Sequence, residues 1–211
     1  MDYNQVLMVE GNDDLHVISA LCCQFGIKET FKIEDCKGVD RILNGLPVRL
    51  KGSGDIKTIG IVVDADVDME RRWLAVRRIL VDSGRYDAVP DVCPNGGLIL
   101  KPLIADDIKV GVWIMPDNRT NGMLENFVAF LVPEEDDLML VVDETLAGIE
   151  SRKLNRYSIV HHDKARVHTW LAWQESPGTP MGMAVTKKYL TTTPAICQDF
   201  VDWLNLLFNE D

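Results

Sequence analysis

Short apolar runs predict the strands in the first half of the chain. The three clearest runs are residues 5–9, 31–36 and 56–63. The third is rich in β-branched residues, a composition typical of strands buried on both faces of a parallel sheet. Each run ends in a polar or glycine-containing segment, where we expect the chain to turn into a helix.

Between and after these strands, apolar residues recur at the spacing of an amphipathic helix. The predicted helices span residues 13–25, 39–50 and 70–82. Gly26 is expected to end the first helix, and Pro47 is expected to shorten the second. Because strand and helix alternate with short connections, the sequence predicts right-handed β-α-β crossovers and a doubly wound α/β sheet.

The second half of the chain is less regular. Residues 84–107 are rich in Gly and Pro without a sustained period, which predicts an irregular insertion or a short hairpin. The pattern then predicts a strand at 110–115, helices at 123–131, 134–151, 164–173 and 196–208, and a turn at 176–180. We therefore expect an α/β domain over residues 1–131 and a helical extension, residues 132–211, packed on it.

Three tryptophans in the tail, Trp170, Trp173 and Trp203, fall on helical faces. Aromatic residues at this spacing usually belong to a core, so we interpret them as packing residues rather than as a platform for stacking bases.

Composition narrows the class of protein. The chain has 211 residues, 46% of them hydrophobic, which is typical of a soluble globular protein. No apolar run approaches the roughly 20 residues of a membrane helix, and no signal peptide precedes the first strand, so we expect no membrane contact and a cytoplasmic location. The five cysteines are odd in number and lack C-x-x-C spacing, which argues against a disulfide framework and a structural zinc site.

The charged residues give arguments both against and for binding of nucleic acid. The formal net charge of −11 counts against nonspecific binding to phosphates, which depends on clustered Lys and Arg. One predicted helix nevertheless carries four arginines. A basic surface on this helix is compatible with the net negative charge of the whole chain. The four arginines are Arg71, Arg72, Arg77 and Arg78.

Acidic residues follow three of the predicted strands. Glu10 ends the first, Asp64 and Asp66 end the third, and Glu125 follows the loop after the strand at 110–115. In open α/β folds, ligands bind off the carboxyl ends of the strands. An extended Asp-x-Asp pair would point to one side, and Asp14, one helical turn beyond Glu10, could face the same cleft.

Such a cluster requires protons or a cation, because ionised carboxylates a few Å apart repel strongly. Oxygen ligands of this kind select Mg²⁺ or Mn²⁺. The alternative for Asp64 and Asp66 is that they cap the next helix, although Asp68 is the best placed of the three for that role. Glu125 could merely complement a helix dipole.

The order of these motifs resembles that of a Toprim (topoisomerase-primase) domain over residues 4–131. The motifs are residues 9–14 (VEGNDD), 37–38 (KG) and 61–66 (IVVDAD). The resemblance extends to the Toprim domains of OLD (overcoming lysogenisation defect) nucleases and their short stand-alone bacterial relatives. Residues 122–125 (GMLE) look like a later acidic motif of that group, and residues 163–174 resemble the C-terminal block of the short relatives, which are known mostly as an uncharacterised family.

The resemblance implies a Rossmannoid parallel sheet and a metal-dependent site that hydrolyses phosphodiesters in DNA or RNA. Glu10 and Asp14 would bind one Mg²⁺ or Mn²⁺, Asp64 and Asp66 a second, with Glu125 as a further ligand. Two such ions about 4 Å apart activate water and neutralise the leaving oxygen.

The resemblance further implies that Lys164 steadies the phosphate as a point charge. His161 and His162 are left open, as proton donors or surface residues. An ATPase subunit is the partner that OLD-type systems suggest, in defence against phage. The sequence leaves open whether two chains pair as a homodimer.

Two other classes of function are weighed against the nuclease. One is a non-catalytic binding or scaffold module that keeps the Toprim fold and a metal, suggested by the net charge, by the lack of a long basic groove in the sequence and by the Trp-rich tail. The other takes Asp64 as a phosphoryl-accepting residue in a receiver-like site, but no matching Lys and Ser or Thr pair stands out. The chain lacks a P-loop, a Gly-x-Gly-x-x-Gly fingerprint and a Gly-x-Ser-x-Gly elbow, which argues against the activities that depend on them.

Overall fold

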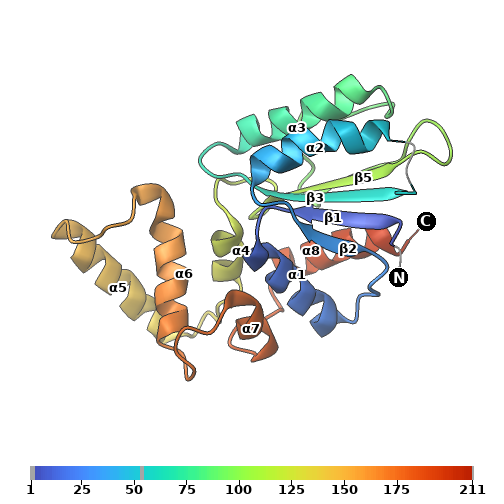
Figure 1. The fold of residues 1–211 in the computed structure, drawn as a ribbon. Coiled ribbons are helices and arrows are strands. Elements are labelled where there is room, and N and C mark those ends of the chain that lie inside the picture. Colours follow the sequence, from blue (N-terminus) through green and yellow to red (C-terminus); the bar gives the residue numbers. More distant parts are fainter. Residues whose placement is uncertain (1–2, 53–54, 211) are drawn as a thin grey trace.

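The computed structural model describes residues 3–52 and 55–210 and shows a mixed α/β fold built on one five-stranded sheet (Figure 1). The strand order is β2 (Lys32–Asp35), β1 (Gln5–Val9), β3 (Thr58–Asp64), β5 (Lys109–Met115) and β4 (Leu98–Leu100). The first four strands are parallel, and β4 pairs antiparallel with β5. The predicted α/β class with a parallel sheet is confirmed.

Helices cover both faces of this sheet. On one face lie α2 (Val39–Lys51) and α3 (Met69–Ser83), and on the other lie α1 (Asn12–Phe25) and α8 (Ala195–Phe208), while α7 (Met181–Thr186) packs against α1 (Figure 1). The central strand β3 is buried over its first six residues, as the β-branched run predicts. Two hydrophobic clusters, one on each face, form the core.

A helical arm extends from one end of the sheet. After α4 (Leu124–Phe130), the chain forms α5 (Asp137–Ser151), a short 3-10 turn (Ile159–His161) and α6 (His162–Ala172), which stand apart from the strands (Figure 1). Arg166 of α6 donates from two nitrogens to the carboxylate of Asp143 in α5, so the two helices are tied to each other. The arm shares the hydrophobic cluster that α1 and α8 form on the sheet.

The C-terminal helix packs so closely on the sheet that only glycine fits beneath it. A Cβ added to Gly111 in β5 would lie 2.4 Å from Leu207 Cδ2, and one added to Gly60 in β3 would lie 2.6 Å from Leu7 Cδ1 and 2.8 Å from Phe208 Cζ. The last helix is therefore part of the same layered core as the strands.

Several predictions about individual elements were wrong. Pro47 does not shorten α2, which continues to Lys51. Its buried stripe of Ile42, Leu46 and Leu50 runs past the proline, and this burial outweighs the lost backbone hydrogen bond. The sequence pattern missed α7 altogether. The prediction for residues 84–107 holds in its hairpin form, because β4 in this region pairs antiparallel with β5, the next strand in the chain.

The tail tryptophans divide into two groups. Trp170 and Trp203 are buried, as expected for packing residues, but Trp173 is 42% exposed. Among the described residues, no helix is long and apolar enough to cross a bilayer.

Candidate functional site

Four carboxylates converge at the carboxyl ends of the parallel strands. Glu10 follows β1, Asp64 ends β3, Asp14 lies in the first turn of α1, and Glu125 lies in the first turn of α4. With Lys164 of α6 they line one pocket of about 250 Å³, which we call the acidic pocket. The structure thus brings together five residues from four separate segments of the chain, since Glu10 and Asp14 are only four residues apart.

Backbone N–H groups hold three of these carboxylates in place. Glu10 Oε1 accepts from Asp64 N at 2.8 Å, and Asp64 Oδ1 accepts from Leu124 N at 3.0 Å. Asp14 Oδ2 accepts from Gly11 N at 3.0 Å. These bonds join β1 to β3 and β3 to α4, so the acidic pocket is positioned by the ends of the sheet itself.

Burial makes it unfavourable for the carboxylates of the acidic pocket to be ionised together without a positive charge beside them. Asp14 is only 7% exposed, and burial together with the Glu10 charge raises its pKa to about 7. The pKa of Asp64 is raised well above its usual range by burial and then by the charges of Asp14 and Glu10. Burial also raises the pKa of Glu10. The carboxylates therefore favour a bound proton or cation.

One cation already faces the pocket. Lys164 Nζ lies 2.9 Å from Glu125 Oε1, and the side chain of Glu125 is only 5% exposed. The hydrogen bond to Glu125 is the main cause that raises the pKa of Lys164, so the lysine stays charged. The ammonium reaches the carboxylates from the helical arm, more than 30 residues beyond α4 in the chain.

Asp66 does not lie in the acidic pocket. Its backbone has a positive φ of 54°, so the expected extended Asp64–Asp66 pair on one side of the chain is wrong. Its Oδ2 instead accepts from Arg72 Nη2 at 2.7 Å, and its backbone pairs with Gly122. The Asp66 charge is still near enough to raise the pKa of Asp64 and of Glu10.

Arg72 is a site residue to which sequence reasoning gave no specific role. Its Nε donates to the backbone oxygen of Asp64 at 2.7 Å while its Nη2 binds Asp66. The signal in the sequence was an arginine in the helix directly after the Asp-x-Asp motif, which we interpreted only as part of a basic face. Asp68 caps α3 as expected, because its Oδ1 accepts from Arg71 N at 2.9 Å.

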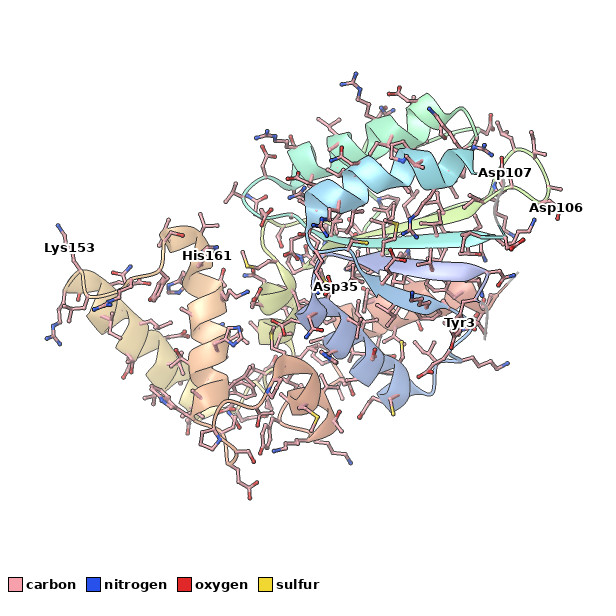
Figure 2. All side chains as sticks on the ribbon, viewed as in Figure 1. Tyr3, Asp35, Asp106, Asp107, Lys153 and His161 are labelled. Atoms are coloured by element: carbon pink, nitrogen blue, oxygen red, sulfur yellow. The ribbon has the colours of Figure 1, made fainter. Side chains whose placement is uncertain are left out.

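The two histidines lie away from the carboxylates. His161 is exposed at the beginning of α6 (Figure 2). His162 Nδ1 lies 2.6 Å from Glu150 Oε1 at the end of α5. Neither histidine lines the acidic pocket, and the contact of His162 belongs to the packing of the arm.

The chemistry of the pocket fits a hard divalent ion. Its acidic side chains offer only oxygen donors, and two of them, Asp14 and Glu125, are nearly fully buried. In residues 3–52 and 55–210, however, no three Asp, Glu, His or Cys side chains are arranged to hold an ion as they stand. Binding would therefore require side-chain rotation toward a shared centre.

Comparisons with known proteins identify the family but no activity. No curated protein matches the chain, and no solved structure matches it. A family model described as "Protein of unknown function (DUF3226)" matches residues 4–209. The match covers nearly the whole chain, and the protein therefore belongs to the DUF3226 family.

Proposed function

We propose that this protein is a Toprim-type phosphodiesterase that hydrolyses nucleic acid with Mg²⁺ or Mn²⁺. The observation that carries the proposal is the convergence of Glu10, Asp14, Asp64 and Glu125 with Lys164 in one pocket at the carboxyl ends of the strands. This is where open α/β sheets bind their ligands. The order of the acidic motifs along the chain, which resembles that of Toprim domains, supports the same activity.

Each residue then has a distinct role. Glu10, Asp14 and Asp64 are the proposed metal ligands, with Glu125 as a further one. A bound divalent ion would supply an activated water and neutralise the leaving oxygen. Lys164, half-exposed beside Glu125, is placed to contact a phosphate oxygen once metal replaces it as the partner of the carboxylates.

Arg72 has a positioning role in this proposal. By binding the Asp64 carbonyl and the Asp66 carboxylate together, it fixes the turn that follows β3. Asp66 then acts at a distance, because its charge raises the affinity of the neighbouring carboxylates for a cation.

The same proposal includes the cellular setting. All five cysteines are free thiols, which fits a reducing cytoplasmic location. An ATPase partner and a role in phage defence follow from the resemblance to OLD-type systems. The net charge of −11 supports a partner that helps to hold the substrate.

Cleavage assays test this function. Purified protein is incubated with single- and double-stranded DNA and RNA in Mg²⁺ or Mn²⁺, alone and with any co-purifying partner. We expect metal-dependent cleavage that Asp64→Asn abolishes and the exposed Asp87→Asn control leaves intact. Wild-type protein that cleaves none of these substrates under any of the conditions would contradict the proposal.

A second candidate is a binding module that keeps the fold without turnover. The observation in its favour is that the described Asp, Glu, His and Cys side chains hold no ready-made metal cage. Under this alternative, Asp64→Asn would leave partner binding unchanged, and calorimetry would detect no Mg²⁺ binding by the wild-type protein.

A further inference from the structure

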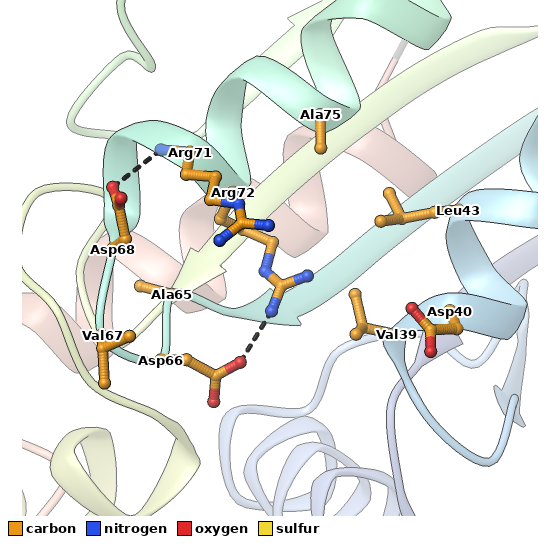
Figure 3. Close-up of a pocket in the computed structure, with 10 residues that line it drawn as sticks. All are labelled: Val39, Asp40, Leu43, Ala65, Asp66, Val67, Asp68, Arg71, Arg72 and Ala75. Atoms are coloured by element: carbon orange, nitrogen blue, oxygen red, sulfur yellow. Dashed lines mark hydrogen bonds and ion pairs between the residues drawn. The ribbon is translucent and has the colours of Figure 1, made fainter. Parts of the chain in front are cut away.

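A second cavity lies directly beside the acidic pocket, between the beginnings of α2 and α3. Its volume is about 360 Å³, within the range of cavities that bind small molecules. We call it the lateral pocket (Figure 3). Its apolar wall is formed by Val39, Leu43, Ala65 and Ala75, and its polar groups include Asp40, Asp66, Arg71 and Arg72.

The lateral pocket and the acidic pocket share a wall. Val39 lines the former, and Gly38, the residue directly before it in the chain, lines the latter. Arg72 similarly joins the two, because it binds the Asp64 carbonyl on one side and the Asp66 carboxylate on the other. A group held in the lateral pocket would therefore be a direct neighbour of a phosphate held over the carboxylates.

The polar groups of the lateral pocket point inward from opposite sides. Figure 3 shows the side chains of Arg71 and Arg72 extending from α3 toward the cavity, with Asp40 across from them on α2. Arg72 is fixed by its two partners, and its side chain is only 14% exposed. The Arg71 side chain forms no ion pair with any residue in the described ranges, which leaves its donors available to a ligand.

The balance of charge disfavours a second phosphate in this cavity. Three carboxylates, Asp40, Asp66 and Asp68, line it against two guanidinium groups. A neutral ligand with donors and acceptors on its edge and a flat apolar face suits such a lining better. Nucleobases have this character: arginine donates to their ring nitrogens and carbonyls, aspartate accepts from their amino groups, and guanidinium planes stack on their faces.

We propose that the lateral pocket binds the base of the nucleotide next to the scissile phosphate. The ring would lie against Val39, Leu43 and Ala75, with its edge toward Arg71 and Asp40. This inference rests on the proposed nuclease function and specifies its substrate. A base in this pocket is not paired, so the substrate is single-stranded or locally opened nucleic acid.

Binding of free nucleosides tests the pocket independently of catalysis. Adenosine, guanosine, cytidine and uridine are titrated into labelled wild-type protein, with ribose as the baseless control, and amide NMR signals of α2 and α3 are followed. We expect at least one nucleoside, but not ribose, to shift signals near Val39, Leu43 and Ala75. Ala75→Trp, which fills the cavity, and Arg71→Ala should each weaken this binding about tenfold or more.

Two substitutions on the same helix serve as matched controls. Leu74→Trp adds the same side chain at a 57% exposed position outside the lateral pocket, and Arg78→Ala removes an arginine that is 84% exposed. Both should bind nucleosides as the wild type does. The catalytic variant Asp64→Asn should also retain nucleoside binding, because its carboxylate lies in the other pocket.

The outcomes separate this inference from the proposed function. Nucleoside binding that Ala75→Trp abolishes, in a protein without nuclease activity, would support the pocket and contradict the nuclease. Metal-dependent cleavage by a protein that binds no nucleoside better than ribose would support the nuclease and overturn the pocket. Cleavage of fully paired duplex as fast as of single strands would likewise overturn the pocket.

Discussion

Glu10 and Asp64 are joined across the sheet by a hydrogen bond of 2.8 Å from the Asp64 backbone N–H to Glu10 Oε1. The bond ties the carboxyl end of β1 to that of β3, and it holds a Glu side chain over the acidic pocket. Since a glutamine oxygen accepts the same bond, Glu10→Gln separates the position of this side chain from its charge.

Glu10→Gln should therefore fold normally and lose activity. We expect cleavage to fall roughly 100-fold or more, about 3 kcal/mol of transition-state stabilisation. Without metal, the variant should melt at the same temperature as the wild type or higher, because one repelling charge is gone. Steady-state cleavage and thermal melting by circular dichroism measure the two effects, and a variant that keeps full activity would show that Glu10 does not bind the metal.

Asp14 should make stability depend on pH in the metal-free protein. Its pKa is raised from 3.8 to about 7 on folding, so its stabilising effect is complete below the unfolded value and disappears as pH rises through about 7. Between about pH 5 and about pH 8, the free energy of unfolding should fall by about 2–3 kcal/mol through this residue.

Urea unfolding at these two pH values measures the effect. Asp14→Asn should flatten the decrease, while the exposed Asp87→Asn should not change it. Saturating Mg²⁺ should restore stability at the higher pH, because metal binds the deprotonated carboxylate. A wild-type and an Asp14→Asn protein with the same pH profile would contradict this assignment.

Lys164 should affect catalysis and metal binding in opposite directions. Its ammonium lies 2.9 Å from Glu125 Oε1, where its positive charge opposes a cation bound at the same carboxylate. Lys164→Met should therefore bind Mg²⁺ at least as tightly as the wild type, yet cleave about 100-fold more slowly because a phosphate contact is lost. Lys101→Met, at an exposed position, is the control. Full activity in Lys164→Met would make the lysine purely structural.

The close packing of α8 on the sheet predicts a contrast between two glycines. In Gly111→Ala the new methyl group would meet the Leu207 side chain, and we expect a loss of about 1–3 kcal/mol in the free energy of unfolding. Gly148 lies inside α5 with nothing within 4 Å of an added Cβ, so Gly148→Ala should stabilise by about 0.5–1 kcal/mol. Equal effects in denaturant unfolding would contradict the close approach of α8.

Most of the sheet could be predicted from the sequence because its signals are local. The apolar run of β1 and the breaking Gly26 after α1 place both elements correctly, and Gly26 adopts the left-handed conformation that ends a helix. The short α7 could not be predicted, because its burial against α1 is a tertiary contact. The prediction that Pro47 shortens α2 was wrong for the same reason. The packing of buried residues before and after this proline outweighs its local preference to end a helix.

In the acidic pocket, too, some positions could be predicted from the sequence and others could not. The positions of Glu10 and Asp64 follow from the strand ends, which sequence patterns predict well. Asp66 could not be placed, because its positive φ and its ion pair with Arg72 depend on the turn that pairs with Gly122. A two-residue spacing predicts a shared side only while the backbone stays extended.

Calorimetry of Mg²⁺ and Mn²⁺ binding tests the central claim most directly. Wild type, Asp64→Asn, Asp66→Asn and the control Asp87→Asn are compared, with folding checked by circular dichroism. We predict that Asp64→Asn abolishes metal binding and that Asp66→Asn only weakens it, because Asp66 faces Arg72 rather than the acidic pocket. Folded wild-type protein that binds neither ion, or an Asp64→Asn variant that binds as tightly as the wild type, would contradict a metal centre at these carboxylates.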